Sequence, residues 1–280
     1  MSTSPSPLSP SASLWRRALA EFTGTGLLVA VVVGSGIMAA RLSPRDTGLE
    51  LLENAVATAA GLAVIILMFG PVSGAHLNPV VSLADWALGR RTRSGLAARD
   101  LAAYLPAQVA GGIGGAVLAN LMFALPAVTA SAKDRSAGHL WLGEVVATAG
   151  LVLLIFALAR SGRARLAPAA VGAWIGAAYW ATSSTSFANP AVTIARAFSN
   201  TFAGIAPASV PGFIIAQAAG AVIGGGLVLL LYPATGSRAG PGPAARGAAA
   251  GRGGYAHDHL DGSRAPAAAG TDHRPPPAAG

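Results

Sequence analysis

Six long runs without a charged residue divide this chain. They cover residues 22–40, 54–84, 101–132, 145–159, 166–195 and 197–237. A helix needs roughly 20 residues to cross a ~30 Å hydrocarbon core, and its backbone polar groups must be hydrogen-bonded within the segment. The pattern therefore predicts an all-α membrane protein with six transmembrane helices, near 16–40, 50–70, 100–123, 139–160, 166–186 and 211–232.

Composition supports the membrane class. Of the 280 residues, 53% are hydrophobic and 11% are charged, and this charged share is about half of what soluble domains carry. The formal charge of +8 does not predict a nucleic-acid partner, because the basic residues are scattered between apolar runs. A lipid bilayer with an anionic surface explains them better. The absence of cysteine excludes disulfides and cysteine-ligated metals.

Arginine placement predicts the orientation in the membrane. If both termini are cytoplasmic, the short cytoplasmic segments hold nine arginines and the outer segments hold five basic residues. This excess agrees with the positive-inside rule. The many arginines against the single Lys133, with abundant Ala and Gly, are typical of GC-rich coding and indicate a bacterial source. We therefore expect a multi-pass protein of the cell membrane.

The two halves of the chain repeat one another. Glu21 near the start of the first span corresponds to Glu144 in the fourth, and an Asn-Pro pair follows both the second and the fifth span. Because each half has three spans, the halves enter the membrane from opposite faces, as in many channels and transporters. We expect a channel domain over 14–234, with repeats at 14–125 and 139–234, between a disordered N-terminal lead (1–13) and a disordered cytoplasmic tail (235–280).

Each Asn-Pro pair begins the part of an uncharged run that the transmembrane helix does not need. The runs 54–84 and 166–195 are each about ten residues longer than one span requires. Asn favours the N-cap and Pro the first helical position, so Asn78 and Asn189 should each cap a half-helix about 15 Å long. Two half-helices from opposite faces would meet at mid-membrane, with positive ends and two donor amides at a pore centre. Either pair alone would equally fit a turn.

Residues 73–80 read SGAHLNPV and residues 186–192 read SFANPAV. They resemble the two signatures of the major intrinsic protein family, the aquaporins and glyceroporins, and the resemblance extends over residues 15–233. It implies an hourglass fold with two re-entrant half-helices and a homotetramer with one pore per subunit. We expect no cofactor. It also implies that Glu21 and Glu144 are buried against the backbone of the re-entrant loops, whereas at the interface they would be ordinary helix-start charges.

His76 lies in the first signature. It is interpreted either as a hydrogen-bonded structural residue that supports the re-entrant loop or as a proton-sensing gate.

The expected selectivity filter departs from the family pattern. Water and glycerol channels carry an Arg three residues after the second Asn, where this chain has Val192. Arg196 lies one turn further on roughly the same face, and it lines the outer vestibule or extends to the membrane interface. Counting from the family pattern assigns the other filter positions to Thr58 (or Ala60, if the following glycine is aligned), Ala177 and Ser186.

Such a filter would be wide and poor in donors. Within the family it resembles bacterial members associated with glycerol-like solutes and with the neutral metalloid acid As(OH)3 (arsenite), and the alternative is a strict water channel. A secondary transporter is the rival class, but it would place an ionisable residue at mid-membrane other than the two glutamates. No Ser-His-Asp set, metal-ligand cluster or phosphate loop is present, so we expect no enzyme.

Overall fold

A computed structural model describes residues 12–90 and 94–232. The tail predicted over 235–280 and nearly all of the lead predicted over 1–13 lie outside the described residues. Within them the chain is helical and has no strand, as predicted. The helices are α1 (Leu14–Leu42), α2 (Thr47–Ser73), α3 (Pro79–Gly89), α4 (Ala98–Met122), α5 (Gly138–Arg160), α6 (Ala167–Ala181), α7 (Pro190–Arg196) and α8 (Val210–Leu231), with 3-10 turns at Ala164–Leu166 and Pro207–Ser209.

Five helical segments of the described chain are long and apolar enough to cross a membrane. They are Leu14–Leu42, Thr47–Ser73, Ala98–Met122, Gly138–Arg160 and Pro207–Leu231. The fifth predicted span, 166–186, is shorter in the structure, because α6 has 15 residues and ends at Ala181. The chain leaves the helix at Thr182, whose backbone is extended and whose hydroxyl donates to the carbonyl of Ala178 at 2.7 Å. The following run of Ser and Thr favours such local hydrogen bonds over a continued helix.

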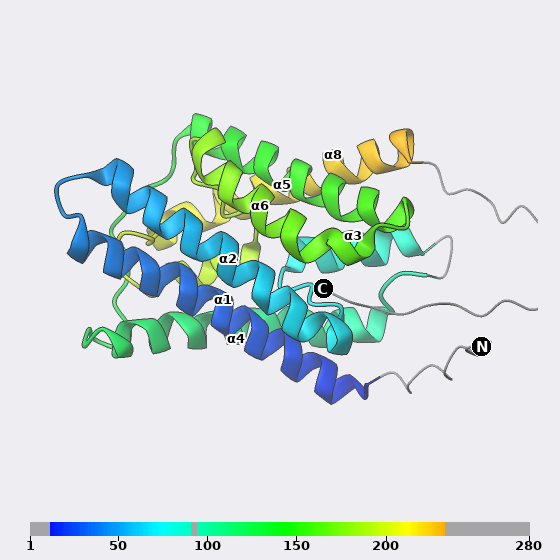
Figure 1. The fold of residues 1–280 in the computed structure, drawn as a ribbon, viewed down its shortest axis with the longest axis horizontal. Helices are drawn as coiled ribbons and strands as arrows, with labels where there is room; N and C mark the ends of the chain where they lie inside the picture. The colour runs from blue at the N-terminus through cyan, green and yellow to red at the C-terminus, as the bar shows by residue number, and fades with distance from the viewer. Residues whose placement is uncertain (1–11, 91–93, 233–280) are drawn as a thin grey trace, which may run out of the picture. The chain divides into compact units, whose positions relative to one another are not determined.

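The two predicted repeats have matching contacts. In the first repeat α1 packs against α2 and α4, and in the second repeat α5 packs against α6 and α8. The short helices cross between the repeats, because α3 touches both α4 and α8 while α7 touches both α8 and α4. Figure 1 shows that α1 begins and α8 ends at the same end of the helix bundle, where α3 also ends.

Glycines allow the long helices of each repeat to approach closely. A Cβ added at Gly111 or Gly115 of α4 would overlap backbone carbonyl oxygens of α1. In the second repeat, a Cβ at Gly220 or Gly224 of α8 would lie 2.5 Å from carbonyl oxygens of α5. Backbones at this separation need small residues at the crossing, as is common in membrane helix pairs. In both helices the two glycines lie four residues apart, a spacing that places them on one face.

We predict that Gly115→Leu destabilises the fold, because the side chain would have to displace the backbone of α1 at Gly26. Overpacking of this kind costs about 1–3 kcal/mol or more. Thermal unfolding of the detergent-solubilised protein measures the effect. Gly114→Leu is the matched control, because a Cβ at the neighbouring Gly114 meets nothing within 4 Å. Equal melting temperatures for the two variants would contradict the role assigned to this crossing.

Candidate functional site

The two short helices begin at the two asparagines. The Asn78 side-chain oxygen accepts a hydrogen bond from the backbone N–H of Val80 at 3.1 Å, and Pro79 occupies the first turn of α3. The Asn189 oxygen accepts from the N–H groups of Ala191 at 3.0 Å and Val192 at 3.3 Å. Both helices thus start at the predicted residues. The asparagine oxygens accept hydrogen bonds from backbone N–H groups of the first turn, which have no partner within the helix.

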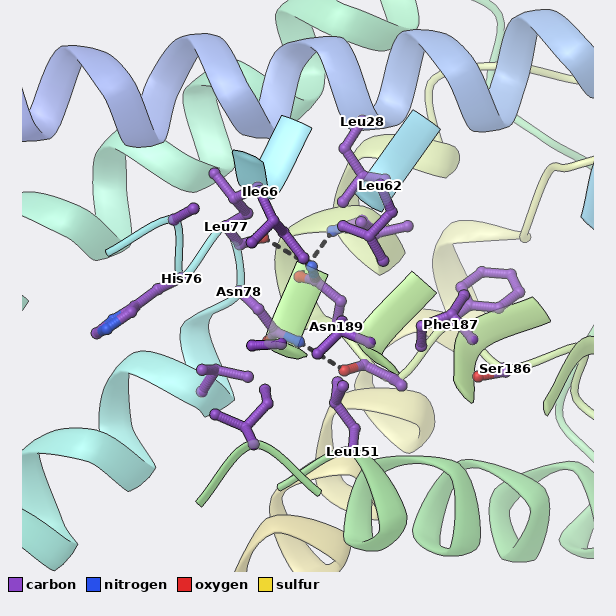
Figure 2. Close-up of a pocket in the computed structure, with 18 of the residues that line it drawn as sticks. Leu28, Leu62, Ile66, His76, Leu77, Asn78, Leu151, Ser186, Phe187 and Asn189 are labelled. Atoms are coloured by element: carbon purple, nitrogen blue, oxygen red, sulfur yellow. Dashed lines mark hydrogen bonds between the residues drawn. The ribbon is translucent and has the colours of Figure 1, made fainter. Parts of the chain in front are cut away.

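The two asparagines also tie the loops to each other. The amide nitrogen of Asn78 donates to the carbonyl of Ala188 at 2.8 Å, and that of Asn189 donates to the carbonyl of Leu77 at 2.8 Å (Figure 2). Each bond uses one of the two N–H donors of the side-chain amide, so one donor remains on each. The tips of α3 and α7 therefore meet at one place, with donors and positive helix ends.

The loops that lead into the two helices share an unusual backbone. Ala75 and Leu77 before Asn78, and Ser186 and Ala188 before Asn189, all have positive φ, between 48° and 52°. These are the same positions in both repeats, three residues and one residue before the asparagine. Left-handed conformations of non-glycine residues cost about 1–3 kcal/mol each and persist only where the surroundings enforce them.

The two buried glutamates hold these loops. Glu21 accepts hydrogen bonds from the backbone N–H groups of His76 at 3.0 Å and Leu77 at 2.6 Å. Glu144 accepts from those of Phe187 and Ala188, both at 2.8 Å. Both glutamates are 0% exposed, so neither lies at the surface as a helix-start charge. Charge-assisted bonds of this kind are the strong ones, and they fix the direction of the strained peptides.

Two glutamines complete this network, and the sequence analysis did not assign them a role. Gln108 donates to Glu21 at 2.8 Å and to the hydroxyl of Ser82 at 3.0 Å. Gln217 donates to Glu144 at 2.6 Å and to the hydroxyl of Thr193 at 2.8 Å. The third and sixth spans share a motif, since residues 106–112 read PAQVAGG and residues 215–221 read IAQAAGA. Both glutamines occupy the same place in it, and this repetition is the sequence signal that could have identified them.

A cavity of about 220 Å³ passes the two asparagines. It is lined by residues of the two loops that lead into α3 and α7 and by aliphatic side chains, among them Leu28, Leu62 and Leu151 (Figure 2). Among the described lining residues, ionisable side chains other than Tyr179 lie only towards the ends, at His76 and Asp85 on one side and Arg196 on the other. Figure 2 shows His76 on one side of the asparagines and Phe187 and Ser186 on the other.

The structure brings together most of the predicted filter residues. Thr58, Ser186, Val192 and Arg196 all line the cavity with the asparagines. The hydroxyl of Ser186 is buried without a hydrogen-bond partner among the described residues, so it is free for a solute.

Ala177 is the exception, because its side chain is exposed and does not line the cavity. Tyr179 lines it instead, and its hydroxyl lies 3.3 Å from that of Thr58. Counting twelve residues back from Asn189 thus assigns the wrong face of α6. Val171, Ile175 and Tyr179 form the lining stripe at a spacing of four, and Ala177 is half a turn away from it.

Arg196 is buried beside the cavity rather than extended to the membrane interface. It is 2% exposed, its Nε donates to the carbonyl of Ala203, and its guanidinium lies 3.4 Å from the centroid of the Phe187 ring. Its terminal amino groups make no hydrogen bond with the described residues. A guanidinium has five donors, so four of those of Arg196 have no hydrogen-bond partner among the described residues.

A second arginine stabilises this end, and it comes from the long connection between α4 and α5. The guanidinium of Arg135 lies 4.9 Å from the Phe187 ring centroid and donates to the carbonyls of Gly204 and Ser184. Sequence reasoning missed Arg135, because it had counted that residue only as an outer charge.

In the same connection, burial and the neighbouring Arg135 and Arg196 lower the pKa of Lys133 to about 8. Arg196 in the lining and Arg135 beside Phe187 make this end of the cavity positively charged, and their charge disfavours a further cation on Lys133.

His76 has structural partners at the other end. Its Nδ1 lies 3.1 Å from the hydroxyl of Ser82, and its ring packs edge-on against Tyr104. Its Nε2 lies 3.7 Å from a carboxylate oxygen of Asp85. That carboxylate also accepts a hydrogen bond from the backbone of Leu96. Through Asp85, His76 thus connects the first loop to the end of the connection between α3 and α4.

Comparisons with known proteins agree with this geometry. The model of the major intrinsic protein family matches residues 9–188. The aquaglyceroporin AqpS of Rhizobium meliloti is 54% identical over 222 residues, which cover 79% of this chain and 92% of that protein. The glycerol uptake facilitator protein of Pseudomonas aeruginosa is 34% identical over 190 residues, 58% of this chain and 65% of that protein. The X-ray structure of the aquaglyceroporin from Plasmodium falciparum has the same fold, with a TM-score of 0.59 at 18% identity, over 77% of this chain and 96% of that one.

We predict that Glu144→Gln lowers the melting temperature. The glutamine keeps the shape of the side chain, but its NH2 group would face an N–H donor of the second loop. Loss of one hydrogen bond to a charged group costs about 1.5–3 kcal/mol, which corresponds to roughly 3–12 °C for a chain of this size. Glu50→Gln, near the start of α2 and away from the loops, is the control and should leave the melting temperature unchanged. An unchanged melting temperature for Glu144→Gln would show that the carboxylate does not hold the loop.

Proposed function

This chain belongs to the major intrinsic protein family, and on that basis we propose that its cavity is a pore for neutral solutes bulkier than water, of the glycerol or As(OH)3 type. The protein is a membrane channel for small neutral solutes. The observation that carries the proposal is Val192, which lines the cavity at the position where water and glycerol channels of the family carry Arg. A valine there leaves space beside the solute that a guanidinium would occupy.

The lining offers a solute both polar and apolar partners. The two loops and the remaining amide donors of Asn78 and Asn189 supply the polar partners. Aliphatic side chains supply the apolar ones. A polyol can therefore exchange its water shell for the polar groups while its carbons contact the aliphatic side chains. Small hydroxylated acids such as As(OH)3 meet the same donors and acceptors.

The same groups oppose the passage of cations. Two helix N-termini point positive partial charge at the centre, and such ends set electrostatic barriers in narrow pores. Arg196 adds a full positive charge at one end of the cavity. We propose that this charge replaces the one that the family places three residues after the second asparagine, but from a position that leaves the pore wider.

A strict water channel is the alternative, and two observations favour it. Arg196 lies in the lining, and the hydroxyls of Thr58 and Tyr179 are 3.3 Å apart across α2 and α6. If these side chains meet around the solute path, the pore would narrow to the width of water. The flux measurements below separate the two candidates.

We also propose an assembly and an orientation. The family resemblance favours a homotetramer with one pore per subunit, and the distribution of arginines favours both termini on the cytoplasmic side of the cell membrane. The proposed channel domain is 14–234, with repeats at 14–125 and 139–234 that follow the two matched sets of helices.

We predict that Asn189→Asp abolishes solute flux while the protein still inserts and folds. An aspartate still caps α7, because Asp and Asn are comparable N-caps. It removes the donor to the carbonyl of Leu77 and puts a negative charge at the pore centre. Stopped-flow swelling of proteoliposomes measures the flux, and size-exclusion chromatography in detergent checks the fold. Wild-type flux in a well-folded variant would contradict the assigned role.

We predict opposite effects for two changes of the filter. Val192→Arg should reduce glycerol and arsenite flux strongly and water flux less, because a second guanidinium fills the lumen but still donates to water. Arg196→Ala should increase glycerol flux, because it removes a side chain from the lining. Both variants are assayed in one liposome series with water, glycerol and arsenite. If Val192→Arg lowers all three fluxes equally and Arg196→Ala changes none, the wide filter is wrong and the water channel is favoured.

A further inference from the structure

A second hollow lies outside the pore, between the half-helix α3 and the last helix α8. It has a volume of about 600 Å³ and an apolar lining that includes Val80, Ala84 and Leu88 of α3 and Ala221, Gly225 and Leu229 of α8. Leu229 is exposed, so the groove opens on the surface of the helix bundle rather than into its core. In a membrane channel that surface faces lipid or another protein chain.

Glycines keep this groove empty. Gly220 and Gly224 of α8 are needed for helix packing, because a Cβ at either would collide with α5. Gly225 and Gly226 are different, since a Cβ at Gly225 meets only Leu88 at 3.9 Å and a Cβ at Gly226 meets nothing within 4 Å. Glycine weakens a helix relative to alanine. Two glycines that no neighbouring helix requires therefore leave the space between α3 and α8 open.

The length of the groove matches one leaflet of a bilayer. Its lining on α8 extends from Ala218 to Leu229, a rise of about 16 Å along the helix axis. Half of a hydrocarbon core is about 15 Å. On the other wall, α3 runs from the pore centre at Pro79 to its end at Gly89. The groove thus begins near mid-membrane and ends at the face where α1 begins and α8 ends (Figure 1).

A positively charged side chain, Arg90, lies at that end of the groove. Arg90 follows the last residue of α3, is exposed, and its guanidinium lies 4.7 Å from the ring centroid of Trp86, which lines the groove. Arg160, at the end of α5, donates to the carbonyl of Tyr232 at the end of α8 and adds a second positive charge at the same face. Asp85, the acidic residue of α3, lines the pore cavity instead of the groove.

We propose that the groove between α3 and α8 is a binding site for one anionic phospholipid, whose acyl chain fills the groove and whose phosphate meets Arg90. The proposal rests only on the chain spanning a membrane and not on which solute the pore admits. An apolar groove one leaflet long, closed at the membrane face by an arginine, complements the shape and charge of such a lipid. Basic residues next to membrane helices attract anionic headgroups in the same way.

The experiment counts the lipid that the intact channel keeps. The full-length protein is placed in nanodiscs of phosphatidylcholine with a minor share of phosphatidylglycerol, extracted gently, and its bound phospholipid per subunit is counted by native mass spectrometry. We expect the wild type to keep one phospholipid per subunit, enriched in phosphatidylglycerol over its share in the nanodisc. Gly226→Leu and, independently, Ala87→Leu fill the groove from its two walls and should lose that lipid. Gly114→Leu, which adds the same side chain at an open glycine of α4, should keep it.

The headgroup is tested separately. Arg90→Gln should keep a lipid but lose the enrichment in phosphatidylglycerol. Arg16→Gln is the matched control, because Arg16 also stacks on a tryptophan, Trp15, but lies on α1 and not at the groove. Lipid retention by both groove-filling variants at the wild-type level would overturn the proposal, and so would enrichment that survives Arg90→Gln. A change of oligomeric mass in those variants would instead assign the groove to a second copy of the chain. Solute flux should be unchanged in all of them, so a wrong solute assignment leaves this result intact.

Discussion

Two ionisable carboxylates buried inside a membrane protein are the constraint on which the pore depends. An unpaired charge in this environment would cost several kcal/mol. Glu21 is compensated by two backbone amides, a serine hydroxyl and a glutamine. Glu144 is compensated by two backbone amides and a glutamine. Because these amides belong to left-handed residues or their neighbours, the carboxylates both require the strained loops and keep them in shape. The loops in turn place the two asparagines.

The crossed bonds between the asparagines convert this local order into a conducting geometry. Each side chain caps its own helix through oxygen and ties the opposite loop through nitrogen. One amide thus fixes the start of a helix, the distance between two helices and the position of a free donor. Aliphatic side chains of the long helices complete the lining of the cavity. A solute therefore meets few polar partners.

The two repeats are similar at the re-entrant loops and differ at the two ends of the pore. α3 has 11 residues and α7 has 7. α7 is shorter than the sequence predicted, because the chain turns after Arg196 and the carbonyls of Ala197 and Phe198 accept hydrogen bonds from the connection between α4 and α5. That connection brings Arg135 to the ring of Phe187. One end of the pore therefore carries Arg196, with Arg135 on the ring of Phe187 beside it, and the other end carries His76 and Asp85.

The sequence by itself determined the features that local chemistry encodes. Uncharged runs set the spans, Asn-Pro pairs set the starts of both half-helices, and the repetition of Glu21 in Glu144 indicated the inverted repeat. Only the tertiary structure decided which residues face the solute. Tyr179 rather than Ala177 lines the cavity because the rotation of α6 depends on its packing against α2. Arg135 reaches Phe187, a residue of the cavity lining, through a long connection whose path follows from hydrogen bonds to distant carbonyls. Spacing along a chain fixes the face of a helix relative to itself, but neighbouring helices fix where that face points.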